Sequence, residues 1–179
     1  MNTANKVTMI RVFLVPLFMV LFMIDNTVCH YVALAVFILA SITDAVDGHI
    51  ARKYNQTTTF GKFVDPLADK VLTTAAFLIL MHYDRMSVWA IMIVLVREFM
   101  VSGVRLVAAG EGNVVAASMW GKLKTVSQMV AIIVAMLLLP VQKFPAAFIS
   151  DVLIWISVVF TVISGIDYLA KNWNLLEMK

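Results

Sequence analysis

The chain has few of the residues that would point to redox chemistry, a cysteine metal site or a soluble domain. One cysteine, Cys29, occurs among 179 residues, so neither an internal disulfide nor a cysteine metal cluster can form. Charged residues make up 14% of the chain, whereas hydrophobic residues make up 62% and the mean hydropathy is +0.93. This composition is far more apolar than that of an average soluble domain, and it predicts an integral membrane protein.

The length then bounds the architecture. A transmembrane helix needs about 20 apolar residues, so the chain has room for roughly six spans and for no separate soluble domain. We predict a single all-α membrane domain over residues 1–179, with a short interfacial helix in residues 1–11. Because no small-residue cleavage site follows the first span, we expect this helix to remain uncleaved. The six transmembrane helices are expected at residues 12–24, 31–52, 61–81, 86–109, 121–139 and 147–169.

The distribution of basic residues predicts the orientation of these spans. An even number of spans places both termini on one side of the membrane, and lysine and arginine are enriched on the cytoplasmic side. Only Arg85 and Lys143 lie on the side opposite the termini, out of 14 basic residues. Both termini are therefore predicted to be cytoplasmic. The residues on that side are Lys6, Arg11, Arg52, Lys53, Lys62, Lys70, Arg97, Arg105, Lys122, Lys124, Lys171 and Lys179.

Residues 44–69 contain four aspartates at helical spacing. Asp44 and Asp47 lie three residues apart, Asp65 and Asp69 lie four apart, and each pair shares one helical face. Four carboxylates at a membrane edge would repel one another, and each costs several kcal/mol to desolvate alone, so a cation is expected between them. Divalent Mg²⁺ and Mn²⁺ prefer oxygen ligands, and two such ions would balance the charge. The pattern predicts a two-metal site for a phosphate-bearing substrate.

A second set of residues is basic and lies in the cytoplasmic halves of the fourth and fifth expected spans. It comprises Arg97, Arg105, Lys122 and Lys124. Arginine and lysine at this depth would bind a substrate phosphate, although positively charged loops and snorkelling to lipid head groups also place such residues near a membrane surface. Arg97 favours the phosphate site, because it lies deeper in its span and Glu98 follows it.

The aspartates also belong to an ordered motif. The order D-x2-D-G-x2-A-R-x8-G-x3-D-x3-D resembles the signature of the CDP-alcohol phosphotransferases at every specified position. The matching residues are Asp44, Asp47, Gly48, Ala51, Arg52, Gly61, Asp65 and Asp69. Within that family, V-R-E-F-M-V-S-G-V-R and G-K-L-K-T-V-S-Q-M resemble the bacterial phosphatidylglycerophosphate synthases, which join CDP-diacylglycerol to sn-glycerol 3-phosphate in the cell membrane.

The resemblance implies roles for individual residues. Asp44, Asp47 and Asp65 would be the principal ligands of two divalent cations, Mg²⁺ or Mn²⁺, while Asp69 would touch one metal and act as the catalytic base. Arg97, Arg105, Lys122 and Lys124 would hold the phosphate of the acceptor. Binding of CDP-diacylglycerol would fall to Asp47, Gly48, Ala51, Arg52 and Gly61, together with Asn5 and Thr8 of an N-x2-T-x2-R pattern that ends at Arg11. The resemblance also implies a homodimer, as in family members of known fold.

Two alternatives stay open at this point. Inositol phosphate could replace glycerol 3-phosphate as the acceptor, whereas serine and free inositol lack the phosphate that the basic residues would bind. A cation transporter also places carboxylates inside spans, but near the midplane and usually within repeated halves, and the chain has no internal repeat. His30, His49 and His82 share no ligand spacing and are expected to be ordinary interfacial or loop residues.

Overall fold

The structure is a computed structural model, and it describes residues 3–53, 59–110, 118–141 and 145–173. For residues 3–8, 44–53, 59–67, 69 and 109 it describes the backbone and not the side chain. The described residues form six α-helices and no strands, as the composition predicted. The chain divides into two compact units, Met1–Tyr83 and Asp84–Lys179.

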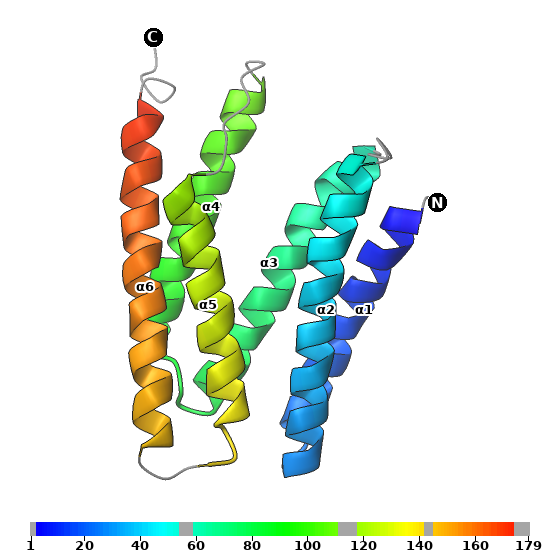
Figure 1. Cartoon of the computed structure of the whole chain (residues 1–179), viewed down its shortest axis with the longest axis vertical. Coiled ribbons are helices and arrows are strands. Elements are labelled where there is room, and N and C mark those ends of the chain that lie inside the picture. The colour runs from blue at the N-terminus through cyan, green and yellow to red at the C-terminus, as the bar shows by residue number, and fades with distance from the viewer. Residues whose placement is uncertain (1–2, 54–58, 111–117, 142–144, 174–179) are drawn as a thin grey trace. The chain divides into compact units, whose positions relative to one another are not determined.

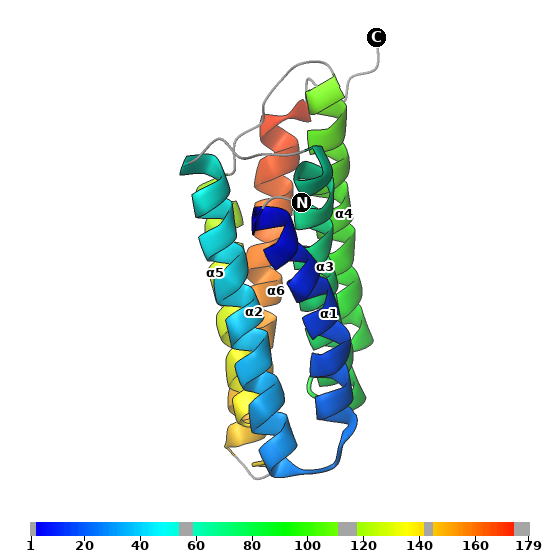
Figure 2. The same ribbon diagram turned by 90° about the vertical axis from the view of Figure 1, so that its right-hand side faces the viewer.

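The first unit contains α1 (Thr3–Met23), α2 (Thr27–Lys53) and α3 (Thr59–His82), and α1 packs against both of the others (Figures 1 and 2). The helix α1 runs without a break from Thr3, so the expected interfacial helix of residues 1–11 is not a separate element in the described residues. No glycine or proline occurs between Thr3 and Val15 to interrupt the helix. Phe18, Phe22 and Phe37 are fully buried, with neighbouring ring centroids 5.3 and 5.6 Å apart.

A polar contact closes one end of this unit. The Tyr83 hydroxyl donates a hydrogen bond of 2.6 Å to the Phe22 carbonyl oxygen and lies 3.2 Å from Nε2 of His30. The His30 ring lies in the first turn of α2, where it is buried and stacks on Phe22 at 5.2 Å. Burial raises the pKa of the Tyr83 phenol above its usual range, and the nearby Asp25 carboxylate adds to the effect. The neutral phenol therefore ties the ends of all three helices together.

Replacement of Tyr83 by phenylalanine should destabilise the protein, because the Phe22 carbonyl loses its donor. We expect a loss of about 1 kcal/mol, or about 2–4 °C in the midpoint of thermal unfolding measured in detergent. The difference from wild type should be constant below pH ~10 and shrink as the pH rises through the raised pKa, since only the neutral phenol donates. Tyr31→Phe, at an exposed position on α2, is the control and should leave the midpoint unchanged.

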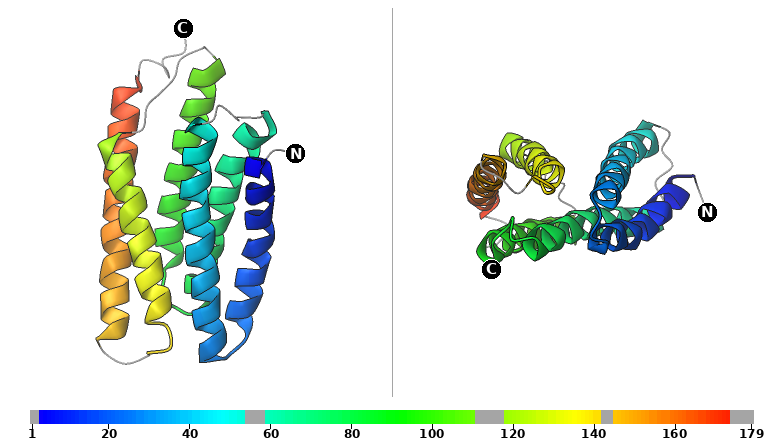
Figure 3. Two further views of the ribbon diagram at one scale, coloured as in Figure 1. Left: turned by 45° about the vertical axis from the view of Figure 1, so that its right-hand side comes forward. Right: turned by 90° about the horizontal axis from the view of Figure 1, so that it is seen from below.

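The second unit contains α4 (Val88–Gly110), α5 (Met119–Leu137) and α6 (Ala146–Lys171), and α6 packs against both α4 and α5 (Figure 3). The buried face of α6 is built from small and hydroxyl residues, which permit close helix packing in a membrane protein. Ser150, Ser157 and Thr161 are buried there, and each donates its hydroxyl to a carbonyl of its own helix. Their polarity is thus satisfied without water.

Two helices are long and apolar enough to cross a membrane among the described residues, namely α5 and α6. Shorter apolar stretches are Met9–Met23, Thr27–Thr43 and Lys70–His82. The helix α4 carries Arg97, Glu98 and Arg105, so charge rather than length separates it from α5 and α6. Together with the composition, these helices indicate a membrane protein.

Candidate active site

The aspartates lie on two helices of the first unit. Asp44 and Asp47 fall within α2, and Asp65 and Asp69 fall within α3, so the helical backbone that their spacing requires is present. At 3.6 residues per turn, each pair therefore shares one face of its helix. The side chains of the four aspartates lie outside the described part of the structure, as do those of Asn5, Thr8, Gly48, Ala51, Arg52 and Gly61.

The chemistry of the expected ligands therefore decides which metal ions fit this site. Among the side chains that the structure describes, no three His, Cys, Asp or Glu residues lie close enough together to hold a metal ion, and the four aspartates are not in that set. Four carboxylates in two registered helical pairs are an oxygen-only donor set, which suits Mg²⁺ or Mn²⁺. The expected metal ligands therefore fit such ions, because all of their donors are oxygen atoms and each pair shares one face of its helix.

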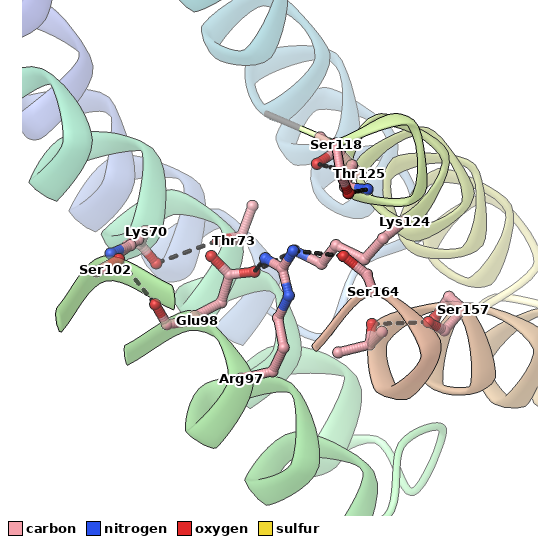
Figure 4. A network of polar contacts seen from close by, with 12 residues as sticks. Lys70, Thr73, Arg97, Glu98, Ser102, Ser118, Lys124, Thr125, Ser157 and Ser164 are labelled. Carbon is pink, nitrogen blue, oxygen red and sulfur yellow. Dashed lines mark hydrogen bonds and ion pairs between the residues drawn. The ribbon is translucent and has the colours of Figure 1, made fainter. Parts of the chain in front are cut away.

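The second unit holds a largely buried cluster of charges, shown in Figure 4. Arg97 of α4 donates from Nη1 to Oε1 of Glu98 at 3.0 Å, and Lys124 of α5 donates from Nζ to the same carboxylate oxygen. The Arg97, Glu98 and Lys124 side chains are 12%, 23% and 6% exposed. Two cations thus share one carboxylate, which leaves the trio with a net positive charge.

Arg97 is also held from its other side. Its Nη2 donates a hydrogen bond of 2.6 Å to the Ser164 hydroxyl of α6. A Cβ built on Gly165 would lie 3.2 Å from Cγ of Arg97, and one built on Gly121 would lie 3.7 Å from its Nη2. The arginine side chain therefore occupies a slot whose walls are glycines of α5 and α6. Its Nε is buried and has no hydrogen-bond partner among the described residues.

The other two expected phosphate-binding residues lie apart from this trio. Arg105 is exposed, and its guanidinium carbon lies 5.6 Å from the centre of the Tyr168 ring. Eight residues separate it from Arg97 on α4, which is about 12 Å along the helix axis. Lys122 is exposed at the start of α5. Of the four basic residues that we selected, the structure brings Arg97 and Lys124 together.

Sequence reasoning missed the residues that hold Arg97 in place. Glu98 was noted only as its neighbour, because consecutive helix residues point about 100° apart and are not expected to pair. Ser164 and Gly165 gave a weak signal, a serine and a glycine within an apolar span. Their relevance depends on the register between α4 and α6, which the sequence does not reveal.

These features define an α-helical membrane protein with two carboxylate-bearing helices and a buried basic cluster. Residues 1–163 match the CDP-alcohol phosphatidyltransferase family, and the chain belongs to that family. Its members generally depend on a divalent cation. The resemblance drawn from the aspartate motif is confirmed.

Curated relatives extend the match over nearly the whole chain. The chain is 44% identical to the CDP-diacylglycerol–glycerol-3-phosphate 3-phosphatidyltransferase of Bacillus subtilis (strain 168), over 98% of this chain and 97% of that protein. It is 36% identical to the protein of the same name from Rickettsia typhi, over 93% and 94%. A probable phosphatidylglycerophosphate synthase of Mycobacterium tuberculosis is 38% identical, over 95% of this chain and 81% of that protein.

Proposed function

We propose that the protein transfers the phosphatidyl group of CDP-diacylglycerol to sn-glycerol 3-phosphate, giving phosphatidylglycerophosphate and CMP. The 44% identity to the Bacillus subtilis enzyme over 98% of the chain carries this proposal. The Arg97–Glu98–Lys124 cluster supports it independently, because a buried group with net positive charge suits an acceptor that bears a phosphate.

The membrane topology that fits this reaction has six spans, both termini in the cytoplasm and the aspartates at the cytoplasmic face of the bacterial inner membrane. The shortest of the six helices, α5, has 19 residues and is about 28 Å long, close to the hydrocarbon thickness of a bilayer. The bias of lysine and arginine toward one side supports the orientation. CDP-diacylglycerol would enter from the inner leaflet, and we expect the enzyme to be a homodimer.

Asp44, Asp47, Asp65 and Asp69 would hold two divalent cations, Mg²⁺ or Mn²⁺. When bound, these ions supply charge stabilisation to the pyrophosphate and to the departing CMP. Arg52 would neutralise the nucleotide phosphate. Gly48, Ala51 and Gly61 lack bulky side chains and would give the cytidine room beside Asp47. Asn5 and Thr8 would contribute to the same substrate from α1.

Asp69 would act as the base. A hydroxyl oxygen of glycerol 3-phosphate forms a bond to the phosphorus of the phosphatidyl group, while the bond from that phosphorus to the CMP oxygen breaks. The hydroxyl proton passes to the Asp69 carboxylate, and CMP leaves with the electron pair. A carboxylate among cations is a weak base, so correct placement of the hydroxyl must supply much of the rate.

Arg97 and Lys124 would bind the acceptor phosphate, with Arg105 and Lys122 nearer the surface as a second set of cations. Arginine offers a planar pair of donors to phosphate, and lysine offers a mobile point charge. The acceptor would therefore be recognised by its phosphate first. This disfavours serine and free inositol as acceptors and leaves inositol phosphate as the competing substrate.

The reaction is tested by measuring CMP release from CDP-diacylglycerol by the purified protein in detergent. The acceptors compared are sn-glycerol 3-phosphate, inositol phosphate, serine and none, each with Mg²⁺ or Mn²⁺ and after chelation. We expect release that requires both glycerol 3-phosphate and a divalent cation. Release only with inositol phosphate would overturn the acceptor, and metal-ion uptake without CMP release would favour a transporter.

Enlarging Gly165 should weaken acceptor binding, because the added methyl group would press on Cγ of Arg97 at 3.2 Å. A displacement of a few tenths of an ångström should raise the KM for glycerol 3-phosphate by about 3–10-fold in Gly165→Ala. Gly103→Ala on α4 is the matched control, because a Cβ there meets nothing within 4 Å. Equal KM values in the two variants would show that the slot does not set the position of Arg97.

A further inference from the structure

A carboxylate at the centre of a phosphate-binding cluster needs an explanation. Glu98 would repel the acceptor phosphate, yet it lies between Arg97 and Lys124 and is largely buried. Positively charged residues alone would attract a phosphate more strongly. The presence of Glu98 therefore indicates a role other than adding to the attraction.

The geometry of Arg97 shows what Glu98 does. Consecutive residues on a helix point about 100° apart, so the ion pair between Arg97 and Glu98 requires the two side chains to turn toward each other. Three contacts hold the Arg97 side chain, namely the carboxylate of Glu98, the hydroxyl of Ser164 and the close approach of Gly165. Together they fix both ends of the guanidinium group.

The same carboxylate oxygen sets the spacing of the two cations. Nη1 of Arg97 and Nζ of Lys124 both donate to Oε1 of Glu98, so the two nitrogens lie within about 6 Å of each other. Free arginine and lysine side chains each lose about 2 kcal/mol of conformational freedom when they are ordered. Ordering them before the substrate arrives removes that cost from binding.

We propose that Glu98 and Ser164 are positioning residues of the acceptor site. Glu98 holds the Arg97 guanidinium and the Lys124 ammonium at a spacing that suits one phosphate group, and Ser164 fixes the second edge of the guanidinium. Neither residue needs to touch the substrate. This inference rests on the proposed function, in which Arg97 and Lys124 bind the acceptor phosphate.

A purely charge-balancing role for Glu98 predicts the opposite result. If the carboxylate only neutralised two buried cations, its replacement by the uncharged glutamine would raise the net charge of the trio and tighten phosphate binding. If it positions them, the same replacement removes the charged group that both cations contact and weakens phosphate binding. The sign of the change in phosphate affinity therefore separates the two roles.

The experiment compares wild type with Glu98→Gln and Ser164→Ala, which keep the side-chain volume nearly constant. The KM values for glycerol 3-phosphate and CDP-diacylglycerol are measured, as is direct binding of radiolabelled inorganic phosphate to the metal-loaded protein. We expect Glu98→Gln to raise the acceptor KM and the phosphate Kd by about tenfold, which corresponds to about 1.4 kcal/mol. Ser164→Ala should raise both by about threefold, as loss of one hydrogen bond predicts. The KM for CDP-diacylglycerol should stay within about twofold of wild type in both variants, since the proposed function assigns the binding of that substrate to other residues.

Ser157→Ala is the matched control. Ser157 is buried on the same helix as Ser164, but its hydroxyl donates to a carbonyl of α6, so its loss should leave all three constants unchanged. Tighter phosphate binding in Glu98→Gln, or equal values in wild type and both variants, would overturn the positioning role. If wild type binds phosphate but releases no CMP with glycerol 3-phosphate, the proposed acceptor is wrong. Weaker phosphate binding in Glu98→Gln would then still support the positioning role.

Discussion

An Asp69→Ala enzyme is expected to lose CMP release by at least about 10³-fold while it still binds CDP-diacylglycerol. General-base catalysis contributes about 10²–10⁴-fold, and this carboxylate would also touch a metal ion, so its removal affects both proton transfer and charge stabilisation. Three aspartates would still hold the cations on which the pyrophosphate binds. The measurements are single-turnover CMP release and equilibrium binding of radiolabelled CDP-diacylglycerol in detergent.

Asp151→Ala is the control for this prediction. Asp151 is an exposed aspartate on α6 for which we assign no catalytic role, so its loss should leave turnover unchanged. Near-normal kcat in Asp69→Ala would show that another group accepts the proton. Loss of CDP-diacylglycerol binding together with turnover would instead make Asp69 primarily a metal ligand.

The second large effect is expected at Arg97. Arg97→Ala removes a cation that would offer two donors to the acceptor phosphate, each charge-assisted bond being worth about 1.5–3 kcal/mol. The kcat/KM for glycerol 3-phosphate should fall by about 10²–10³-fold, mainly through KM. Arg97→Lys keeps the charge but loses the planar fork, and its kcat/KM should lie between those of wild type and Arg97→Ala.

Lys122→Ala provides the comparison for Arg97. Its side chain is exposed and lies outside the buried trio, so exposed-charge energetics predict a change in kcat/KM of no more than about threefold. Raising the salt concentration should reduce that small effect and leave the Arg97 effect largely intact, because buried charges are screened less. Comparable losses in Lys122→Ala and Arg97→Ala would mean that the acceptor phosphate binds at the surface rather than in the slot.

The helices were predictable because their signals are long and their boundaries are chemically marked. The apolar run of α5 ends shortly before Pro140, and Pro145 directly precedes α6, so the expected spans 121–139 and 147–169 lie within two residues of Met119–Leu137 and Ala146–Lys171. The prediction of a separate interfacial helix in residues 1–11 was wrong for the described residues, where α1 is continuous from Thr3. The prediction rested on the polar residues of this segment, but nothing in Thr3–Val15 breaks a helix. Polarity alone does not end a helix.

The candidate site was predictable in part. The aspartate motif identified the family, since eight residues at fixed spacing are specific, and the roles of individual aspartates stay predictions. The partners of Arg97 could not be found from the sequence. Glu98 precedes Ser164 by 66 positions, and only the packing of α4 against α6 makes them contacts of one guanidinium. The burial of His30 likewise depends on Phe22 and Tyr83, which belong to other parts of the chain.

The division of the chain at Tyr83–Asp84 has a consequence for how the family could change its products. On the proposed assignment, the residues that activate the nucleotide lipid all precede this junction, and the residues that select the alcohol all follow it. Substitutions after this junction would then change which alcohol the enzyme accepts, while the residues that activate the nucleotide lipid stay the same. Chimaeras that exchange the sequence after Tyr83 between relatives should inherit their acceptor from the C-terminal parent and their nucleotide donor from the N-terminal parent.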